Sequence, residues 1–122
     1  EKERLRAQTN NYPDPIQKDK LQTDKDYDEA IEYCVNNISD IAICAGSHNE
    51  NSAQMLVSLM KKNQLPANDK RIYFSQLLGM SDHISFNLSN SGYKVSKYVP
   101  YGPVLAVIPY LTRRAQENSG SV

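Results

Sequence analysis

Apolar residues recur with helical spacing between positions 27 and 38. They stand at i, i+3, i+4, i+7, i+8 and i+11, and they are Tyr27, Ala30, Ile31, Cys34, Val35 and Ile38. This spacing places them on one face and predicts an amphipathic helix that begins near Asp26. The continuous apolar run from Ile41 to Ala45 predicts a strand covered on both faces, as in parallel sheets.

A strand, a short loop and a helix follow one another three times. After the first strand, Asn49 or Asn51 is expected to cap a helix that runs to about Lys62. The inner face of that helix is predicted to carry Ala53, Leu56, Val57 and Met60. The second unit is predicted as a strand at Ile72 to Leu77 and a helix that opens at Ser81 and Asp82. The third is predicted as a strand at Val95 to Val99, a turn at Pro100 to Pro103 and a helix ending near Asn118.

This repeat predicts an α/β fold with a parallel sheet, preceded by a helix-favouring segment at residues 1–8 and a turn-rich segment at residues 10–15. Three such units and a preceding helix do not close a (β/α)8 barrel, which takes eight strands and about 250 residues. Unpaired strand edges are avoided by natural proteins. We therefore expect the chain to be part of a larger barrel or to pair with another chain.

Charge and length exclude several classes of protein. The 122 residues contain 14 Lys and Arg against 14 Asp and Glu, so nucleic acid is not an expected partner. The longest apolar runs, such as Val104 to Ile108, are far shorter than the roughly 20 residues of a membrane helix, and no signal pattern is visible at the start. The sequence thus predicts a soluble domain.

The cysteine and histidine pattern predicts no metal site. Cys34 and Cys44 lie in apolar patterns, where we expect buried free thiols in a reducing compartment. The sequence contains no CxxC motif, no histidine and cysteine cluster and no HExxH motif.

Four residues of the last predicted helix share one face, at i, i+3, i+4 and i+7: Tyr110, Arg113, Arg114 and Glu117. Paired guanidinium groups suit the bidentate binding of a small carboxylate. A solvated surface with an Arg–Glu salt bridge explains the same spacing and is the commoner case. The spacing alone leaves both interpretations open.

Other candidates lie where predicted strands end. Tyr98 ends one strand and His48 follows another, and in parallel barrels active sites form at that rim. His48 is equally explained as a loop or capping histidine, and His83 as a structural residue near a helix start. The tyrosine- and proline-rich stretch from Lys97 to Pro103 resembles an extended peptide-binding surface, but one instance is a weak signal.

Three motifs, in matching order and spacing, resemble the end of the proline dehydrogenase barrel. They are Gln76 to Met80, Lys97 to Gly102 and Pro109 to Asn118. The resemblance extends upstream through Ser47-His48-Asn49, Thr23-Asp24 and residues 1–4, so it covers essentially the whole chain. It implies the C-terminal portion of a proline-dehydrogenase-type (β/α)8 TIM barrel, a flavoprotein of proline catabolism. In such an enzyme FAD oxidises L-proline to pyrroline-5-carboxylate and electrons pass to a quinone.

The resemblance also implies roles for individual residues. Arg113 and Arg114 match the arginines that hold the substrate carboxylate. Residues that match the lining of the proline pocket are Tyr98, Tyr110 and Leu77. Residues that match the loop touching FAD are Ser47, His48 and Asn49, with Gln76 and Glu117 as lesser candidates.

The resemblance leaves part of the enzyme unaccounted for. The family's flavin-contacting arginine strand and the early lysine and aspartate have no counterpart in these residues, so we expect the missing barrel half in the same or another chain and no turnover by this chain alone.

A related imino acid such as hydroxyproline, or a non-catalytic fragment that docks on a partner, remains an alternative. The implied location is cytoplasmic or peripheral to a membrane in bacteria, and mitochondrial in eukaryotes. Pro109, within the last helix, predicts a kink or a fresh first turn there.

Overall fold

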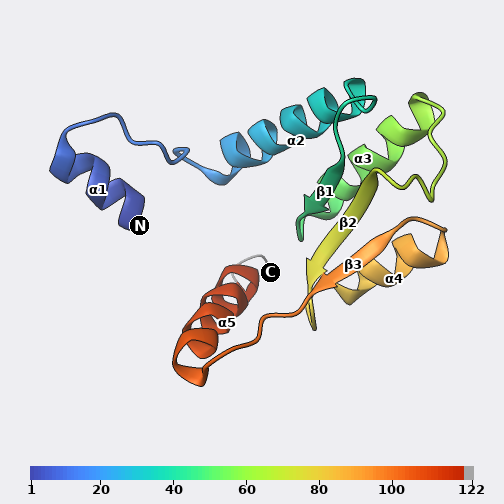
Figure 1. The fold of residues 1–122 in the computed structure, drawn as a ribbon. Coiled ribbons are helices and arrows are strands. Elements are labelled where there is room, and N and C mark those ends of the chain that lie inside the picture. The colour runs from blue at the N-terminus through green and yellow to red at the C-terminus, as the bar shows by residue number, and fades with distance from the viewer. Residues whose placement is uncertain (120–122) are drawn as a thin grey trace.

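The computed structural model describes residues 1–119. Its elements are α1 (Lys2–Asn10), α2 (Lys20–Asn36), β1 (Ile43–Gly46), α3 (Glu50–Lys62), β2 (Ile72–Leu77), α4 (Asp82–Asn90), β3 (Val95–Tyr98) and α5 (Val104–Ser119). Figure 1 shows α1 at the end of an extended connection, away from the sheet.

The three strands form one parallel sheet in the order β1-β2-β3. Ile43 pairs with Ile72 in the register of β1 and β2, and Leu77 pairs with Tyr98 in that of β2 and β3. Each strand is followed by a helix, as the repeat predicted (Figure 1). The prediction of an α/β fold with three parallel strand–helix units is confirmed.

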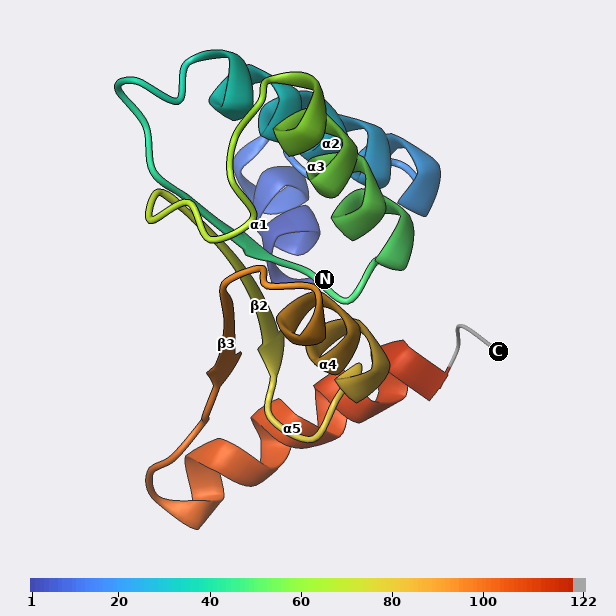
Figure 2. The same ribbon diagram turned by 90° about the vertical axis from the view of Figure 1, so that its right-hand side faces the viewer.

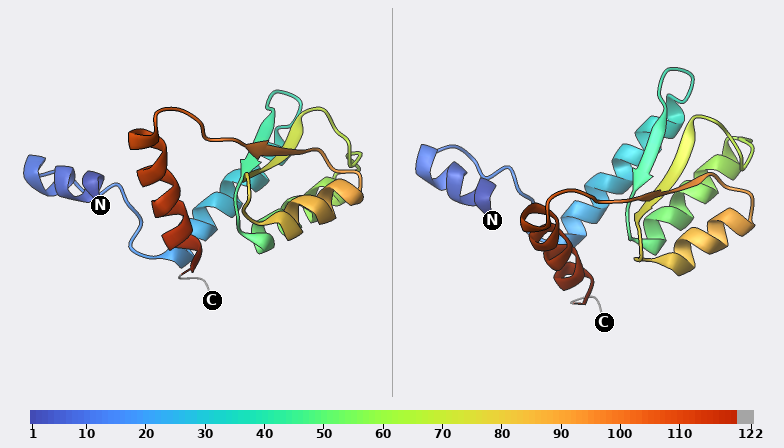
Figure 3. Two further views of the ribbon diagram at one scale, coloured as in Figure 1. Left: turned by 90° about the horizontal axis from the view of Figure 1, so that it is seen from below. Right: turned by 60° about the horizontal axis from the view of Figure 1, so that its bottom comes forward.

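The hydrophobic core lies between the sheet and the helices α2 and α3. Its buried residues come from both helices and from the inner side of the strands: Ile31, Val35, Ala45, Leu56, Leu59, Met60, Ile72 and Phe74. The ring of Phe74 also packs edge-on against Tyr93, with 5.7 Å between ring centroids. Figures 2 and 3 show α3 and α4 on the same side of the sheet.

The opposite face of the sheet is open in the described part of the chain. In β1, Ala45 faces the core while Cys44 is exposed, and in β2 the ring of Tyr73 remains 38% exposed. The prediction that the first strand is covered on both faces is therefore wrong for these residues, because the helices that cover the sheet lie on one side. For the same reason Cys44 is not a buried thiol. Cys34 is half-buried, and both cysteines are free.

The boundaries of α2 and α5 differ from the sequence patterns. Helix α2 begins at Lys20, before the predicted start, because Asp19 caps it by accepting a 2.8 Å hydrogen bond from the backbone of Gln22. Helix α5 is continuous through Pro109, so no fresh first turn begins there. Residues 120–122 lie outside the described residues. Among the residues that the structure describes, none belongs to a helix that is long and apolar enough to cross a membrane.

Candidate functional site

The carboxyl ends of the three strands meet at one edge of the sheet, which we call the rim. Figure 1 shows the arrows of β2 and β3 pointing toward the side where α5 lies. Loop residues 47–49 follow β1, Leu77 ends β2 and Tyr98 ends β3. The rim is where parallel β/α folds place their functional side chains.

The loop after β1 is held by its own polar groups. The Asn49 side chain caps α3 and accepts hydrogen bonds from the backbone of Asn51 (3.0 Å) and Ser52 (3.4 Å). The Ser47 hydroxyl accepts one from the Asn49 backbone at 3.0 Å. Burial raises the pKa of Tyr27, and a hydrogen bond with the Ser47 side chain partly offsets that rise. Ser47 and Asn49 thus have structural roles within the described chain.

His48 is held between β2 and the start of α4. Its Nδ1 lies 2.6 Å from the hydroxyl of Ser81, and its Nε2 accepts a 3.4 Å hydrogen bond from the backbone of Leu77. Burial lowers the pKa of His48, and the nearby charge of Lys97 lowers it further. Both effects favour the neutral imidazole.

Gln76 and Leu77 end β2 with their side chains on opposite faces of the sheet. Gln76 is 3% exposed; its amide donates to the carbonyl of Ser47 at 3.2 Å and accepts from the hydroxyl of Ser85 at 2.9 Å. Leu77 is 5% exposed and is the register partner of Tyr98. Gln76 therefore braces the loop after β1, whereas Leu77 lies on the same face of the sheet as Tyr98 but is already covered there.

A second group of predicted site residues joins β3 to α5. The rings of Tyr98 and Tyr110 pack edge-on, with 6.4 Å between their centroids. The guanidinium of Arg114 lies over the Tyr110 ring, 5.1 Å from its centroid. The structure thus brings three of the predicted substrate-binding residues together.

Arg114 also forms an ion pair within its own helix. Its Nε and Nη2 donate to the two carboxylate oxygens of Glu117 at 2.8 and 2.6 Å. These bonds raise the pKa of Arg114 and lower that of Glu117. The salt bridge expected from the solvated interpretation is present, while Arg113 is exposed on the adjacent part of the helix.

Two residues at the rim were missed as site residues by the sequence analysis. Ser81 was predicted only as the start of a helix. It occupies the N-cap position of α4, but its side chain makes no cap hydrogen bond because the hydroxyl meets His48. Lys97 appeared only within a motif, yet its ammonium bonds the Met80 carbonyl and the Asp82 carboxylate, each at 2.8 Å. Ser81 is 33 residues from His48, and Lys97 is 17 and 15 residues from Met80 and Asp82, so the sequence carries no local signal for these contacts.

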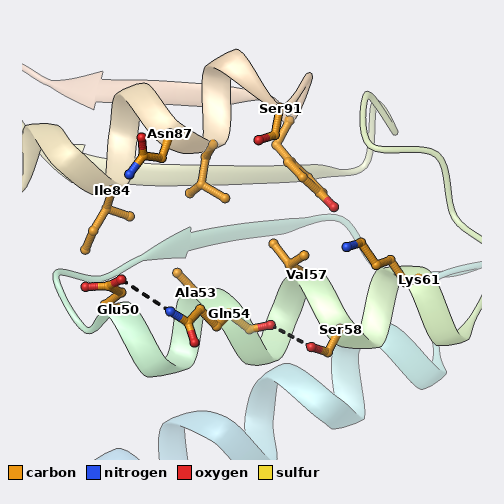
Figure 4. A pocket seen from close by; sticks show the side chains of 11 residues that line it. Glu50, Ala53, Gln54, Val57, Ser58, Lys61, Ile84, Asn87 and Ser91 are labelled. Atoms are coloured by element: carbon orange, nitrogen blue, oxygen red, sulfur yellow. Dashed lines mark hydrogen bonds between the residues drawn. The ribbon is translucent and has the colours of Figure 1, made fainter.

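A pocket in the described chain lies away from the predicted site residues. It is a groove of about 640 Å³ between α3 and α4, drawn in Figure 4. Ala53, Val57 and Ile84 contribute apolar groups, and Glu50 and Lys61 contribute charged ones. In residues 1–119 no cluster of three or more His, Cys, Asp or Glu side chains is placed to hold a metal ion.

The fold and the rim define the class of protein: parallel strand–helix units of the β/α-barrel type, with polar and aromatic side chains at the carboxyl ends of the strands. The proline dehydrogenase family model matches residues 1–122. The chain therefore belongs to the proline dehydrogenase family.

Individual relatives agree with this assignment. Human mitochondrial proline dehydrogenase 1 is 44% identical over 96% of this chain and 20% of its own length, and the Drosophila melanogaster protein of the same name is 41% identical over 98% and 19%. Human hydroxyproline dehydrogenase is 39% identical over 97% of this chain and 26% of its own length. This chain thus spans about a fifth of the length of the proline dehydrogenases that it matches.

A solved structure supports the fold. The crystal structure of proline utilization A (PutA) from Bdellovibrio bacteriovorus, inactivated by N-propargylglycine, superposes with a TM-score of 0.86 at 27% identity. The match covers 96% of this chain and 12% of that protein. The fold class predicted from the sequence is confirmed by this similarity.

Proposed function

We propose that this chain is part of an enzyme of proline catabolism that oxidises L-proline to pyrroline-5-carboxylate with FAD. The observation that best supports this proposal is the group in which Tyr98 meets Tyr110 and Arg114 lies over the Tyr110 ring. Aromatic edges beside a guanidinium suit a small apolar ring that bears a carboxylate, which is the shape of proline. The family membership supplies the reaction type.

In this proposal Arg113 and Arg114 bind the carboxylate of proline. A guanidinium has five N–H donors, and Glu117 engages Nε and Nη2 of Arg114. The Tyr110 side chain also hydrogen-bonds Arg114, and the five donors of the guanidinium exceed the three that Glu117 and Tyr110 use, so these partners orient Arg114 without occupying it fully. Arg113 is exposed and brings a second planar set of donors to the same end of α5. Leu77, which is buried, and Tyr98, its register partner, form the apolar side of the pocket for the proline ring.

The rim also suits a flat ring system with polar edges, as FAD has. A Cβ built on Gly46 would meet nothing within 4 Å, so the backbone at the end of β1 is open to close approach. The loop of Ser47, His48 and Asn49 borders this space, and Gln76 supports that loop through Ser47. Glu117 acts on this site through its ion pair with Arg114. When bound, FAD supplies the acceptor for a hydride from the carbon next to the proline nitrogen.

Hydroxyproline is the second candidate substrate. Hydroxyproline dehydrogenases from human and Xenopus laevis are 39% and 38% identical to this chain, close to the values for the proline dehydrogenases. One additional hydroxyl on the same ring would be recognised by side chains outside the carboxylate clamp. A non-catalytic fragment that docks on a partner chain is a third, weaker candidate, since it leaves the rim without a role.

The proposal extends to the rest of the protein. The missing strands of the barrel, in the same or another chain, would cover the open face of the sheet and complete the pocket. Electrons would pass from the flavin to a quinone, with peripheral membrane association of the full enzyme. The location would be mitochondrial in a eukaryote, as the names of the human and fly relatives state for those proteins, and cytoplasmic or membrane-peripheral in a bacterium.

Anaerobic titration of the purified full-length protein tests this function. The flavin absorbance should be bleached by L-proline, at lower concentrations than by trans-4-hydroxy-L-proline, and not by D-proline. A preference for hydroxyproline would select the second candidate. A protein that binds no flavin, or whose flavin neither imino acid reduces, would contradict both.

A further inference from the structure

The His48 ring is fixed by contacts from outside its own loop. Ser81, 33 residues further along the chain, lies at Nδ1, and the backbone of Leu77, 29 residues along, lies at Nε2. A loop histidine of this kind would otherwise rotate freely about its side-chain bonds. The two contacts come from β2 and from the start of α4, so they tie three parts of the rim together.

These contacts define the tautomer of His48. A backbone N–H can only donate, so Nε2 accepts from Leu77 and carries no proton. In the neutral ring the proton then resides on Nδ1, which donates to the Ser81 hydroxyl. A ring protonated on both nitrogens would direct two N–H groups at each other at Leu77.

Ser81 has an unusual backbone for a residue with a side chain. Its φ of 51° and ψ of 40° are left-handed, a region that is strained for a non-glycine residue. It occupies the N-cap position of α4 without using its hydroxyl as a cap. The hydroxyl is directed at His48 instead, so the left-handed backbone of Ser81 serves the contact with His48.

Lys97 holds the loop that carries Ser81. Its side chain is 20% exposed and crosses from β3 to the Met80 carbonyl and the Asp82 carboxylate. These two residues flank Ser81 directly. Charge-assisted hydrogen bonds on both sides of one residue restrict where its hydroxyl can point.

We propose that Ser81 and Lys97 are positioning residues for His48. Ser81 holds the imidazole in the orientation in which Nε2 faces the Leu77 N–H, so that the ring keeps the Nδ1–H tautomer, and Lys97 fixes the place of Ser81. Neither residue is assigned a contact with substrate or cofactor. The inference deepens the proposed function, because it states how the cofactor-side loop is held, and it rests on that function only for its effect on FAD binding.

Nitrogen NMR of the full-length protein, labelled with ¹⁵N-histidine and measured near pH 8, tests the tautomer directly. His48→Ala identifies the signals of His48 by their loss. In the parent we expect a pyrrole-type Nδ1 and a pyridine-type Nε2. Ser81→Gly keeps the left-handed backbone and removes the hydroxyl, so the ring can turn away from the Leu77 N–H and the two signals should move toward each other as tautomers interconvert. Lys97→Met should shift them in the same direction, and Lys97→Arg less so.

FAD affinity provides the second measurement. Loss of one hydrogen bond that orders the loop should raise the Kd for FAD about three- to tenfold in Ser81→Gly, and His48→Ala should raise it at least as much with less effect on proline affinity. Ser89→Ala, on the exposed side of α4, is the matched control and should behave as the parent. Unchanged ring-nitrogen signals in both Ser81→Gly and Lys97→Met would overturn the proposal. Altered signals with parental FAD affinity in Ser81→Gly and His48→Ala would support the positioning role and remove His48 from the proposed cofactor site.

Discussion

Arg114 illustrates how one side chain can satisfy two interpretations of a sequence pattern. The spacing of the helix face fits either a carboxylate clamp or a surface salt bridge, and the structure contains the salt bridge with Glu117. That ion pair is exposed and contributes little stability by itself. It does fix the plane of the guanidinium over Tyr110, which is what a clamp requires before its ligand arrives.

Arg113→Lys and Arg114→Lys in the full-length enzyme are each expected to weaken proline binding about ten- to a hundredfold. Lysine keeps the charge but loses the planar set of donors, and charge-assisted hydrogen bonds are worth about 1.5 to 3 kcal/mol. The measurement is the Kd for proline and for a carboxylate analogue, from perturbation of the flavin spectrum. FAD content should change much less, and Arg6→Lys on α1 serves as the control. Parental affinity in both lysine variants would show that the arginines are surface charges.

Asp69 supplies a pH-dependent contribution to stability. Hydrogen bonds from Arg71 lower its pKa from 3.8 to about 2, and the carboxylate is buried while Arg71 is 44% exposed. A depressed pKa stabilises the fold above the unfolded value, and this contribution is lost as the pH falls through about 2. The shift corresponds to at most about 2.5 kcal/mol, which solvent at Arg71 reduces to about 1 kcal/mol.

Asp69→Asn should therefore lower the free energy of unfolding by about 1 kcal/mol at pH 7, and the difference from the parent should vanish near pH 2. Urea unfolding at both pH values measures it. Asp14→Asn, which removes an exposed ion pair with Arg4, is the control and should have little effect at either pH. A difference that stayed constant with pH would show that the carboxylate charge is not the cause.

At the scale of elements, the cap of α3 has two assigned tasks. Asn49 accepts hydrogen bonds from the first turn of the helix, and under the proposed function it also borders FAD. Asn49→Ala should lower the free energy of unfolding of the flavin-free protein by about 1 kcal/mol, whereas Asn49→Asp should retain the cap. If Asn49→Asp restores stability but not FAD affinity, the amide nitrogen serves the cofactor. Equal stability in all three proteins would contradict the capping role.

The sequence predicted elements well where one face of an element is buried. Helix α3 was predicted nearly to its ends because its capping residue and its buried Leu56 and Met60 are both visible in the pattern. Helix α2 begins before the predicted start because its first turns are largely exposed and carry no apolar periodicity, so the cap at Asp19 was the available signal. A pattern that reports burial cannot locate the part of a helix that packs on nothing.

The sequence predicted only those parts of the site that lie on a single helix or directly after a single strand. The face of Tyr110 and Arg114 follows from helical spacing, and the residues after each strand follow from the parallel sheet. The contact of His48 with Ser81 and the bracing of Ser47 by Gln76 join residues about 30 positions apart and depend on how the strands register. Such pairings are set by the assembled sheet, not by local propensity.

For the whole molecule, the open face of the sheet has a consequence for the chain in isolation. Cys44 and Tyr73 are exposed on it, and the outer edges of β1 and β3 have no strand partner in the described part of the chain. Exposed edges and apolar faces associate. Expressed alone, the 122 residues should therefore self-associate, whereas the full-length protein should not. Sedimentation velocity distinguishes the two, and a stable monomer of the isolated chain would show that the sheet needs no further strands.

The connection between β3 and α5 affects how tightly Arg113 and Arg114 can bind a ligand at the rim. Helix α5 reaches the rim through residues 99–103, which include Pro100 and Pro103, and it touches β3 through the rings of Tyr98 and Tyr110. A tether made stiff by proline keeps a tethered group at a high effective concentration, while a flexible one dilutes it. Under the proposed function, the affinity for a small carboxylate is thus governed in part by two prolines that have no assigned role in binding it.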